Sequence, residues 1–150
     1  MGKLSWMNDG LMDRNKTTTN LFVYGTLMPG EANHGQIENY VRASRRGTVE
    51  GVLIDLGRFP ALVRGRGIVK GVLLEVDEEA LAITDRIEGF VPERARCLYL
   101  REEVIVRLEE GQEMAAWTYV FADPDSVAGR PSLIVSEIEG TPVFAWRRQQ

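Results

Sequence analysis

The chain has very little cysteine or histidine. Its 150 residues include one cysteine, Cys97, and one histidine, His34. A single cysteine excludes an internal disulfide and fits a reducing cytoplasm, which is where we expect the protein to act. No suitably placed serine accompanies His34 as the base of a triad, so we interpret His34 as part of a surface loop or a helix cap. Zinc sites usually use several His and Cys ligands, so we expect no metal and no other cofactor.

Long apolar runs and long basic runs are also missing. No segment approaches the roughly 20 apolar residues that are needed to cross a bilayer, so we expect no membrane partner. The formal net charge is −4, from 18 basic and 22 acidic residues. Without a basic stretch to contact phosphates, we expect no nucleic acid partner either.

Length and composition predict one globular domain. A hydrophobic fraction of 44% and a charged fraction of 27% are ordinary values, and 150 residues can bury a substantial core. Residues 1–20 are polar and lack the apolar centre of a secretory signal, so we interpret them as a flexible N-terminal leader. The single domain would then span residues 21–150. The sequence specifies no oligomeric state, and a monomer is the simplest expectation.

Residues 21–30, LFVYGTLMPG, predict a buried strand that ends in a tight turn. The apolar and aromatic run before Gly25 is typical of a buried strand, and Pro29 cannot continue a sheet ladder. Gly25 lets the backbone turn sharply or lie close to a ligand. Such a turn can direct several backbone N–H groups at a carboxylate or at an oxyanion that forms during a reaction. An ordinary turn without function remains the alternative, and the spacing is not that of a phosphate loop.

Two segments in the middle of the chain repeat one pattern. Residues 49–56 and 69–76 both read as strands with a glycine near the start, Gly51 and Gly71. A glycine at this place indicates a bulge or a strong bend in the sheet. We expect residues 59–63 to add a short edge strand between them. The region therefore predicts a strongly coiled antiparallel meander.

Residues 77–89 predict the clearest helix of the chain. Asp77 can cap its first turn, and Gly89 stands where helices commonly end. At about 100° per residue, Ala80, Ile83 and Ile87 form its apolar face. The sequence thus predicts a helix that packs one face on the sheet.

Glu88, at the end of this helix, falls near the edge of the apolar face. In apolar surroundings the pKa of its carboxyl group would rise, and the group could exchange protons near neutral pH. The alternatives are a side chain that turns to solvent and one that pairs with Arg86 or Arg94. The helix pattern alone leaves these alternatives open.

Two further strands are expected at residues 96–107 and 113–121. The period of two places Trp117, Tyr119 and Phe121 on one apolar face of the second strand. A buried Tyr119 would need a hydrogen-bond partner for its hydroxyl group. Residues 143–146 predict a last strand, and no role can be assigned to the tail after Gly129.

A set of short motifs, in this order and spacing, resembles the gamma-glutamylcyclotransferase-like family. The motifs are Tyr24-Gly25-Thr26-Leu27, Asn33, Gly51-x-Leu53, Phe59-Pro60-Ala61, Asp85-Arg86-Ile87-Glu88-Gly89, Tyr99-x-Arg101 and Trp117-x-Tyr119. Thr84 stands where the family pattern has an apolar residue. The resemblance implies an α+β fold, a small mixed β-barrel built mainly from an antiparallel sheet, with flanking helices. It also implies a cavity between the Tyr-Gly-Thr-Leu loop and the glutamate of the Glu-Gly pair.

The same resemblance implies the chemistry of a cyclotransferase, in which a γ-glutamyl amide closes to 5-oxoproline and releases an amine. The substrate's own α-amine is the nucleophile, so the chain needs no catalytic serine, cysteine or metal. Glu88 would be the general acid and base. The backbone at Gly25, Thr26 and Leu27 would bind the substrate carboxylate or the oxyanion.

The remaining residues of the expected site are tyrosines. Tyr99 and Tyr119 would orient the γ-glutamyl group through their hydroxyl groups. Tyr24 would form a wall of the cavity or belong to the core. The expected partner is therefore a small γ-glutamyl compound, whose leaving amine the sequence does not identify.

Two other functions fit the same residues. One is a non-catalytic module that binds γ-glutamyl or acidic small molecules. The other is an amidase in which Glu88 activates water and releases glutamate. The retained carboxylate argues against the first, since it weakens binding of an acid unless it meets an ammonium group.

Overall fold

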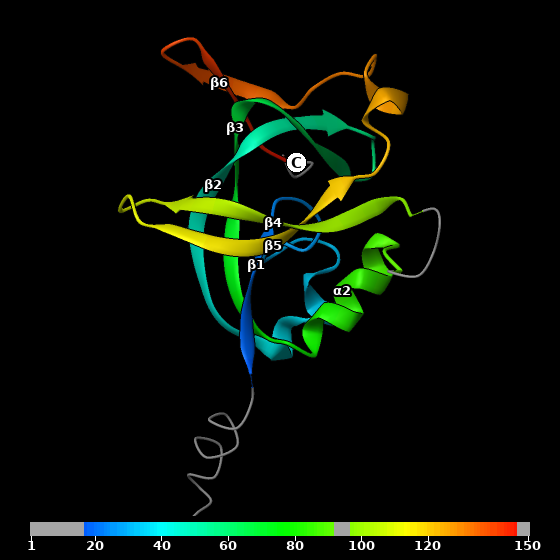
Figure 1. Cartoon of the computed structure of the whole chain (residues 1–150), viewed down its shortest axis with the longest axis vertical. Coiled ribbons are helices and arrows are strands. Elements are labelled where there is room, and N and C mark those ends of the chain that lie inside the picture. Colours follow the sequence, from blue (N-terminus) through cyan, green and yellow to red (C-terminus); the bar gives the residue numbers. More distant parts are fainter. Residues whose placement is uncertain (1–16, 92–96, 147–150) are drawn as a thin grey trace, which may run out of the picture.

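A closed barrel of five strands forms the body of the protein (Figure 1). The computed structural model describes residues 17–91 and 97–146. The barrel strands are β1 (Thr18–Val23), β2 (Val41–Asp55), β3 (Pro60–Asp77), β4 (Tyr99–Leu108) and β5 (Glu113–Phe121). They follow the order β1-β5-β4-β2-β3, and β1 pairs with β3 to close the ring. The β1–β5 pair is parallel and the other barrel pairs are antiparallel, which confirms the expected mixed barrel.

The two repeated segments lie side by side as parts of β2 and β3, where Val49 pairs with Val69. The register shifts between Glu50 and Val52, so the bulge expected at Gly51 is confirmed. Gly71 has a different role. A side chain at this position would strike the carbonyl oxygen of Val23 and the ring of Phe22, so glycine lets β1 lie close against β3. The expected edge strand at residues 59–63 was wrong, because Pro60 begins the long strand β3 itself.

A hairpin of β6 (Ile134–Ile138) and β7 (Thr141–Phe144) extends the sheet beyond the barrel. Strand β7 runs parallel to β3 and pairs Val143 with Ile68. It begins two residues before the strand expected at 143–146 and ends at Phe144. The 3₁₀ helix η3 (Pro124–Val127) precedes this hairpin.

Helix α2 (Ala80–Glu88) packs beside the barrel and ends as expected at Gly89, whose φ of 74° is left-handed. Its start was predicted too early. Asp77 closes β3 and forms an ion pair of 2.9 Å with Arg42, so its carboxylate does not cap the helix. Glu79 is the N-cap residue and forms no side-chain cap bond.

The start of the first strand also differs from expectation. Strand β1 begins at Thr18, since Thr18 to Asn20 pair with the last residues of β3, and the leader expected up to residue 20 is therefore too long. Two short 3₁₀ helices, η1 (His34–Gln36) and η2 (Glu38–Tyr40), follow the loop after β1. Strand β2 then starts at Val41.

Two apolar clusters lie on the two faces of the barrel sheet. Alternate residues of β1 divide between them: Phe22 belongs to the inner cluster, while Leu21 and Val23 pack with residues of α2 in the outer one. Tyr99 and Tyr119 also belong to the outer cluster. No helix within residues 17–91 and 97–146 combines the length and apolar character that a membrane span requires. The end of α2 thus lies over an apolar sheet face that bears two phenols.

Candidate active site

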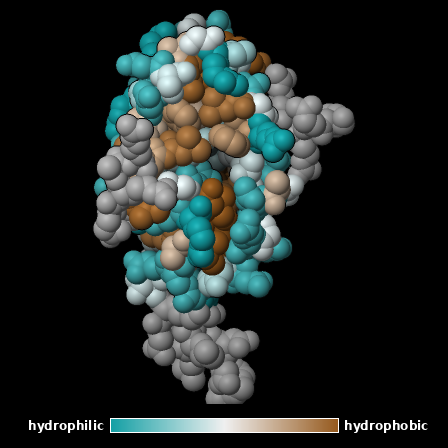
Figure 2. Space-filling model, turned by 90° about the vertical axis from the view of Figure 1, so that its right-hand side faces the viewer, coloured by the Kyte–Doolittle hydropathy of each residue, from teal (hydrophilic) through white to brown (hydrophobic). Residues whose placement is uncertain are grey.

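A cavity of about 270 Å³ lies where the loop after β1, the turn before β3 and the end of α2 meet. The expected cavity between residues 25–27 and Glu88 is therefore present. Tyr24, Tyr99 and Tyr119 also line it. Figure 2 shows the face of the molecule that carries α2, on which apolar residues gather around a hollow. The sequence thus predicted the main walls of this cavity.

The loop of residues 25–27 is held by its carbonyl groups. Thr26 accepts a hydrogen bond of 2.8 Å from the backbone of Asn33, and Leu27 accepts one of 2.8 Å from Nδ1 of His34. The side chain of Asn33 also donates to Oγ1 of Thr26 at 2.9 Å. His34 lies in η1 and is half-buried, so it supports the loop rather than standing free on the surface.

The N–H groups of the same loop are left for a ligand. Within the described part of the chain, the amides of Gly25, Thr26 and Leu27 have no hydrogen-bond acceptor. Glycine is required at 25, because a Cβ atom there would lie 2.7 Å from Cγ of Pro60. Fixed amides of this kind can bind a carboxylate or a developing oxyanion.

Glu88 is the last residue of α2 and contributes the only acidic side chain among the described residues that line the cavity. It forms no ion pair or hydrogen bond with any of these residues or with the rest of the described chain. Arg86 is exposed and does not pair with it, and Arg94 lies outside the described residues. Burial raises the pKa of Glu88 from its ordinary 4.5 to about 7, as expected for apolar surroundings. The carboxyl group can therefore both accept and donate a proton near neutral pH.

Three phenols line the same cavity as this carboxyl group, and each donates its proton to the protein. Tyr24 donates to the carbonyl of Tyr119 at 2.6 Å, and Tyr99 donates to the carbonyl of Pro60 at 2.7 Å. Burial raises the pKa of Tyr24, Tyr99 and Tyr119, so all three stay protonated at neutral pH. Because the protons are already used, the phenol oxygens can act towards a ligand only as acceptors, and Thr84 already contacts the oxygen of Tyr119.

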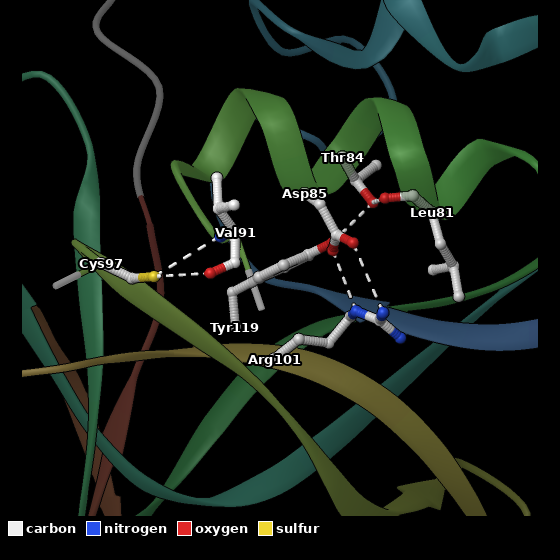
Figure 3. Close-up of polar contacts among 7 residues, drawn as sticks. All are labelled: Leu81, Thr84, Asp85, Val91, Cys97, Arg101 and Tyr119. Carbon is white, nitrogen blue, oxygen red and sulfur yellow. Dashed lines mark hydrogen bonds and ion pairs between the residues drawn. The ribbon is translucent and has the colours of Figure 1, made fainter. Parts of the chain in front are cut away.

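A polar cluster attaches α2 to the barrel (Figure 3). The hydroxyl of Tyr119 donates to Oδ1 of Asp85 at 2.6 Å and contacts Oγ1 of Thr84 at 2.7 Å. Arg101 of β4 binds the same carboxylate at 2.9 Å and lies 4.8 Å from the ring centre of Trp117. Asp85 precedes Glu88 by about one helical turn. The hydrogen-bond partner that a buried Tyr119 was expected to need is therefore Asp85, which lies on the helix that carries Glu88.

Two features of the site were missed by the sequence analysis. The first is this cluster, for which the need of Tyr119 for a partner was the available signal. The second is Arg58, which lines the cavity from the turn between β2 and β3. The part of the chain that the structure describes holds no group of three or more His, Cys, Asp or Glu side chains that could share a metal.

The first prediction concerns the cluster around Asp85. The variant Asp85→Ala leaves Arg101 without its carboxylate, and we expect the free energy of unfolding to fall by about 2 kcal/mol. Urea denaturation measures this change. Glu113→Ala is the matched control, since its ion pair with Arg107 is exposed (53% and 68%, against 16% and 19% for Asp85 and Arg101). A loss in the control as large as in Asp85→Ala would contradict the prediction.

The second prediction follows from the raised pKa of Glu88. The folded protein holds a proton up to about pH 7 that the unfolded chain releases near 4.5, so ionisation of Glu88 costs stability as pH rises between these values. Glu88→Gln removes this cost. From pH 4.5 to 8, we expect the stability of the variant relative to the native protein to increase by on the order of 3 kcal/mol. Urea denaturation at both pH values tests it, with exposed Glu78→Gln as control, and a pH-independent difference would contradict it.

Comparisons with known proteins agree with the fold. Residues 21–138 match the family described as gamma-glutamyl cyclotransferase, AIG2-like. The gamma-L-glutamyl-butirosin B gamma-glutamyl cyclotransferase of Niallia circulans is 39% identical over 113 residues, which cover 74% of this chain and 72% of that protein.

An AIG2-like protein from Mus musculus has the same fold, with a TM-score of 0.62 and 22% identity over 89% of this chain and 98% of the other. YkqA from Bacillus subtilis is longer: the match covers 71% of this chain and 36% of YkqA, with a TM-score of 0.58 and 25% identity. The chain therefore belongs to the AIG2-like gamma-glutamyl cyclotransferase family.

Proposed function

We propose that the protein converts a γ-glutamyl amide to 5-oxoproline and a free amine. The observation that carries the proposal is the carboxyl group of Glu88, which lines the cavity, forms no ion pair with any described residue and has a pKa of about 7. A γ-glutamyl group brings the missing cation as its α-ammonium group. The lone pairs of Tyr99 and Tyr119 supply further acceptors for that ammonium.

The reaction follows from this placement. Glu88 takes a proton from the α-ammonium, and the resulting amine attacks the γ-carbonyl carbon of the same molecule. A five-membered ring forms and the carbonyl oxygen becomes an oxyanion. Glu88 returns its proton to the leaving nitrogen as the C–N bond breaks, and the ionised Glu88 then takes the second proton of the ring nitrogen and passes it to the departing amine, which leaves as an ammonium ion. Attack within one molecule supplies much of the rate when the cavity holds the chain folded.

The amides of Gly25, Thr26 and Leu27 would bind negative charge on the substrate. Two groups compete for this role, the α-carboxylate and the oxyanion that forms at the γ-carbon. Either assignment makes the loop a donor set fixed before the substrate arrives, because its carbonyl groups are bound by Asn33 and His34.

The third prediction is the product. Purified protein incubated with a panel of γ-glutamyl amides, including γ-glutamyl-butirosin B because of the relative from Niallia circulans, is assayed for 5-oxoproline by mass spectrometry. We expect 5-oxoproline from the native protein and a rate at least about 100-fold lower from Glu88→Gln. Glu78→Gln, at an exposed position before α2, should keep the native rate.

Other products would favour the other functions. Glutamate in place of 5-oxoproline would show hydrolysis with Glu88 as the base. No product, together with a higher melting temperature in the presence of γ-glutamyl compounds, would indicate the binding module. Equal rates for the native protein and Glu88→Gln would reject the role of Glu88.

The fourth prediction is the pH dependence of kcat/KM. Glu88 must be ionised in the free enzyme to accept the first proton, so activity should increase as pH rises through about 7. Well below this value, kcat/KM should fall about tenfold for each pH unit. Initial rates between pH 5 and 8 measure the profile. A flat profile over this range would contradict a base with this pKa.

A further inference from the structure

The turn between β2 and β3 fixes the backbone of Arg58 at the cavity. The N–H of Gly57 donates to Oδ1 of Asp55 at 2.7 Å, and the N–H of Leu56 donates to the carbonyl of Phe59 at 3.1 Å. Gly57 has a left-handed φ of 95°, which favours glycine. Arg58, Phe59 and Pro60 then follow one another along the cavity wall. The position of Arg58 is therefore set by a short, internally bonded turn.

The cavity is lined by two opposite charges that differ in exposure. Among its described lining residues, only Arg58 and Glu88 are charged. Glu88 lies inside, where burial raises its pKa, whereas Arg58 is exposed to solvent. Arg58 forms no ion pair or hydrogen bond within residues 17–91 and 97–146. Its guanidinium group is thus available to a ligand that occupies the cavity.

A γ-glutamyl amide has one end for each of these charges. Its α-ammonium must reach Glu88 for the ring to close, so the leaving amine would extend from the γ-carbonyl towards the more exposed residues of the lining. These are Arg58, with Phe59 and Leu98 as apolar neighbours in the lining, the latter 49% exposed. Guanidinium binds carboxylates with two parallel hydrogen bonds and repels cations.

We infer that Arg58 binds a carboxylate on the leaving amine, so that the substrates are γ-glutamyl derivatives of amino acids or peptides. The inference rests on the proposed cyclotransferase function and adds the class of its leaving group. Phe59 and Leu98 supply an apolar surface for the side chain of that amino acid. Leaving amines with a positive charge elsewhere in their structure are disfavoured, because the same guanidinium group repels them.

The fifth prediction compares two substrates that differ in one group. γ-Glutamyl-alanine has a carboxylate on its leaving amine, and γ-glutamyl-alaninamide has a neutral amide of nearly the same shape. For the native protein we expect kcat/KM to be about tenfold higher with γ-glutamyl-alanine, the size expected of a charge-assisted contact at an accessible site. In Arg58→Gln this ratio should fall to about one. Arg66→Gln, which removes an exposed arginine of β3 outside the cavity lining, should keep the native ratio.

Each other result has a defined meaning. A ratio that stays near ten in Arg58→Gln would overturn the inference and leave the cyclotransferase function standing. Equal losses with both substrates would also overturn it, since Arg58 would then bind the α-carboxylate that they share. A native ratio near or below one would reject the preference for amino acids. If the native protein forms no 5-oxoproline from any γ-glutamyl amide, the proposed function fails, and the inference fails with it.

Discussion

The bond between α2 and the barrel through Asp85 is the interaction on which the geometry of the cavity depends. One carboxylate receives the hydroxyl of Tyr119 from β5 and the guanidinium of Arg101 from β4. Tyr119 in turn accepts at its backbone carbonyl the hydroxyl of Tyr24, which follows β1. Three strands and the helix are thereby joined in one chain of hydrogen bonds. Because Glu88 lies about one turn further along the helix, the same chain fixes the carboxyl group relative to the phenols.

The sequence predicted the parts of the site that depend on local patterns. Helical periodicity placed Glu88 at the edge of an apolar face, and the structure shows it half-buried in the lining of a mostly apolar cavity. The period of two placed Tyr119 on a buried face, where it needed a partner. The unexpected Thr84 has a physical reason too, because its hydroxyl contacts that of Tyr119 at 2.7 Å in a buried setting. The barrel itself was predicted only through the resemblance to the family. The local patterns alone predicted a strongly coiled meander.

Features that depend on distant pairing could not be predicted in this way. Asp77 has the properties of a helix cap, but its ion pair with Arg42, across the β2–β3 pairing, keeps it in the strand. Thr18 to Asn20 read as a polar leader, yet they pair with the end of β3. Arg58 resembles any surface cation on a turn until the turn is placed beside the cavity. In each case the deciding contact is with a residue far away in the sequence.

The parallel pairing of β1 with β5, the first and last strands of the barrel along the chain, has a consequence for how the protein folds. Leu21 pairs with Trp117, and the hydroxyl of Tyr24 reaches the carbonyl of Tyr119, 95 positions later. Contacts of such long range form slowly, because the loop between them must be ordered before they stabilise it. During synthesis the first strand leaves the ribosome long before its partner exists. The chain must therefore be made as far as β5 before the cavity can form. Any activity that depends on the cavity is then evidence that β1 and β5 have paired.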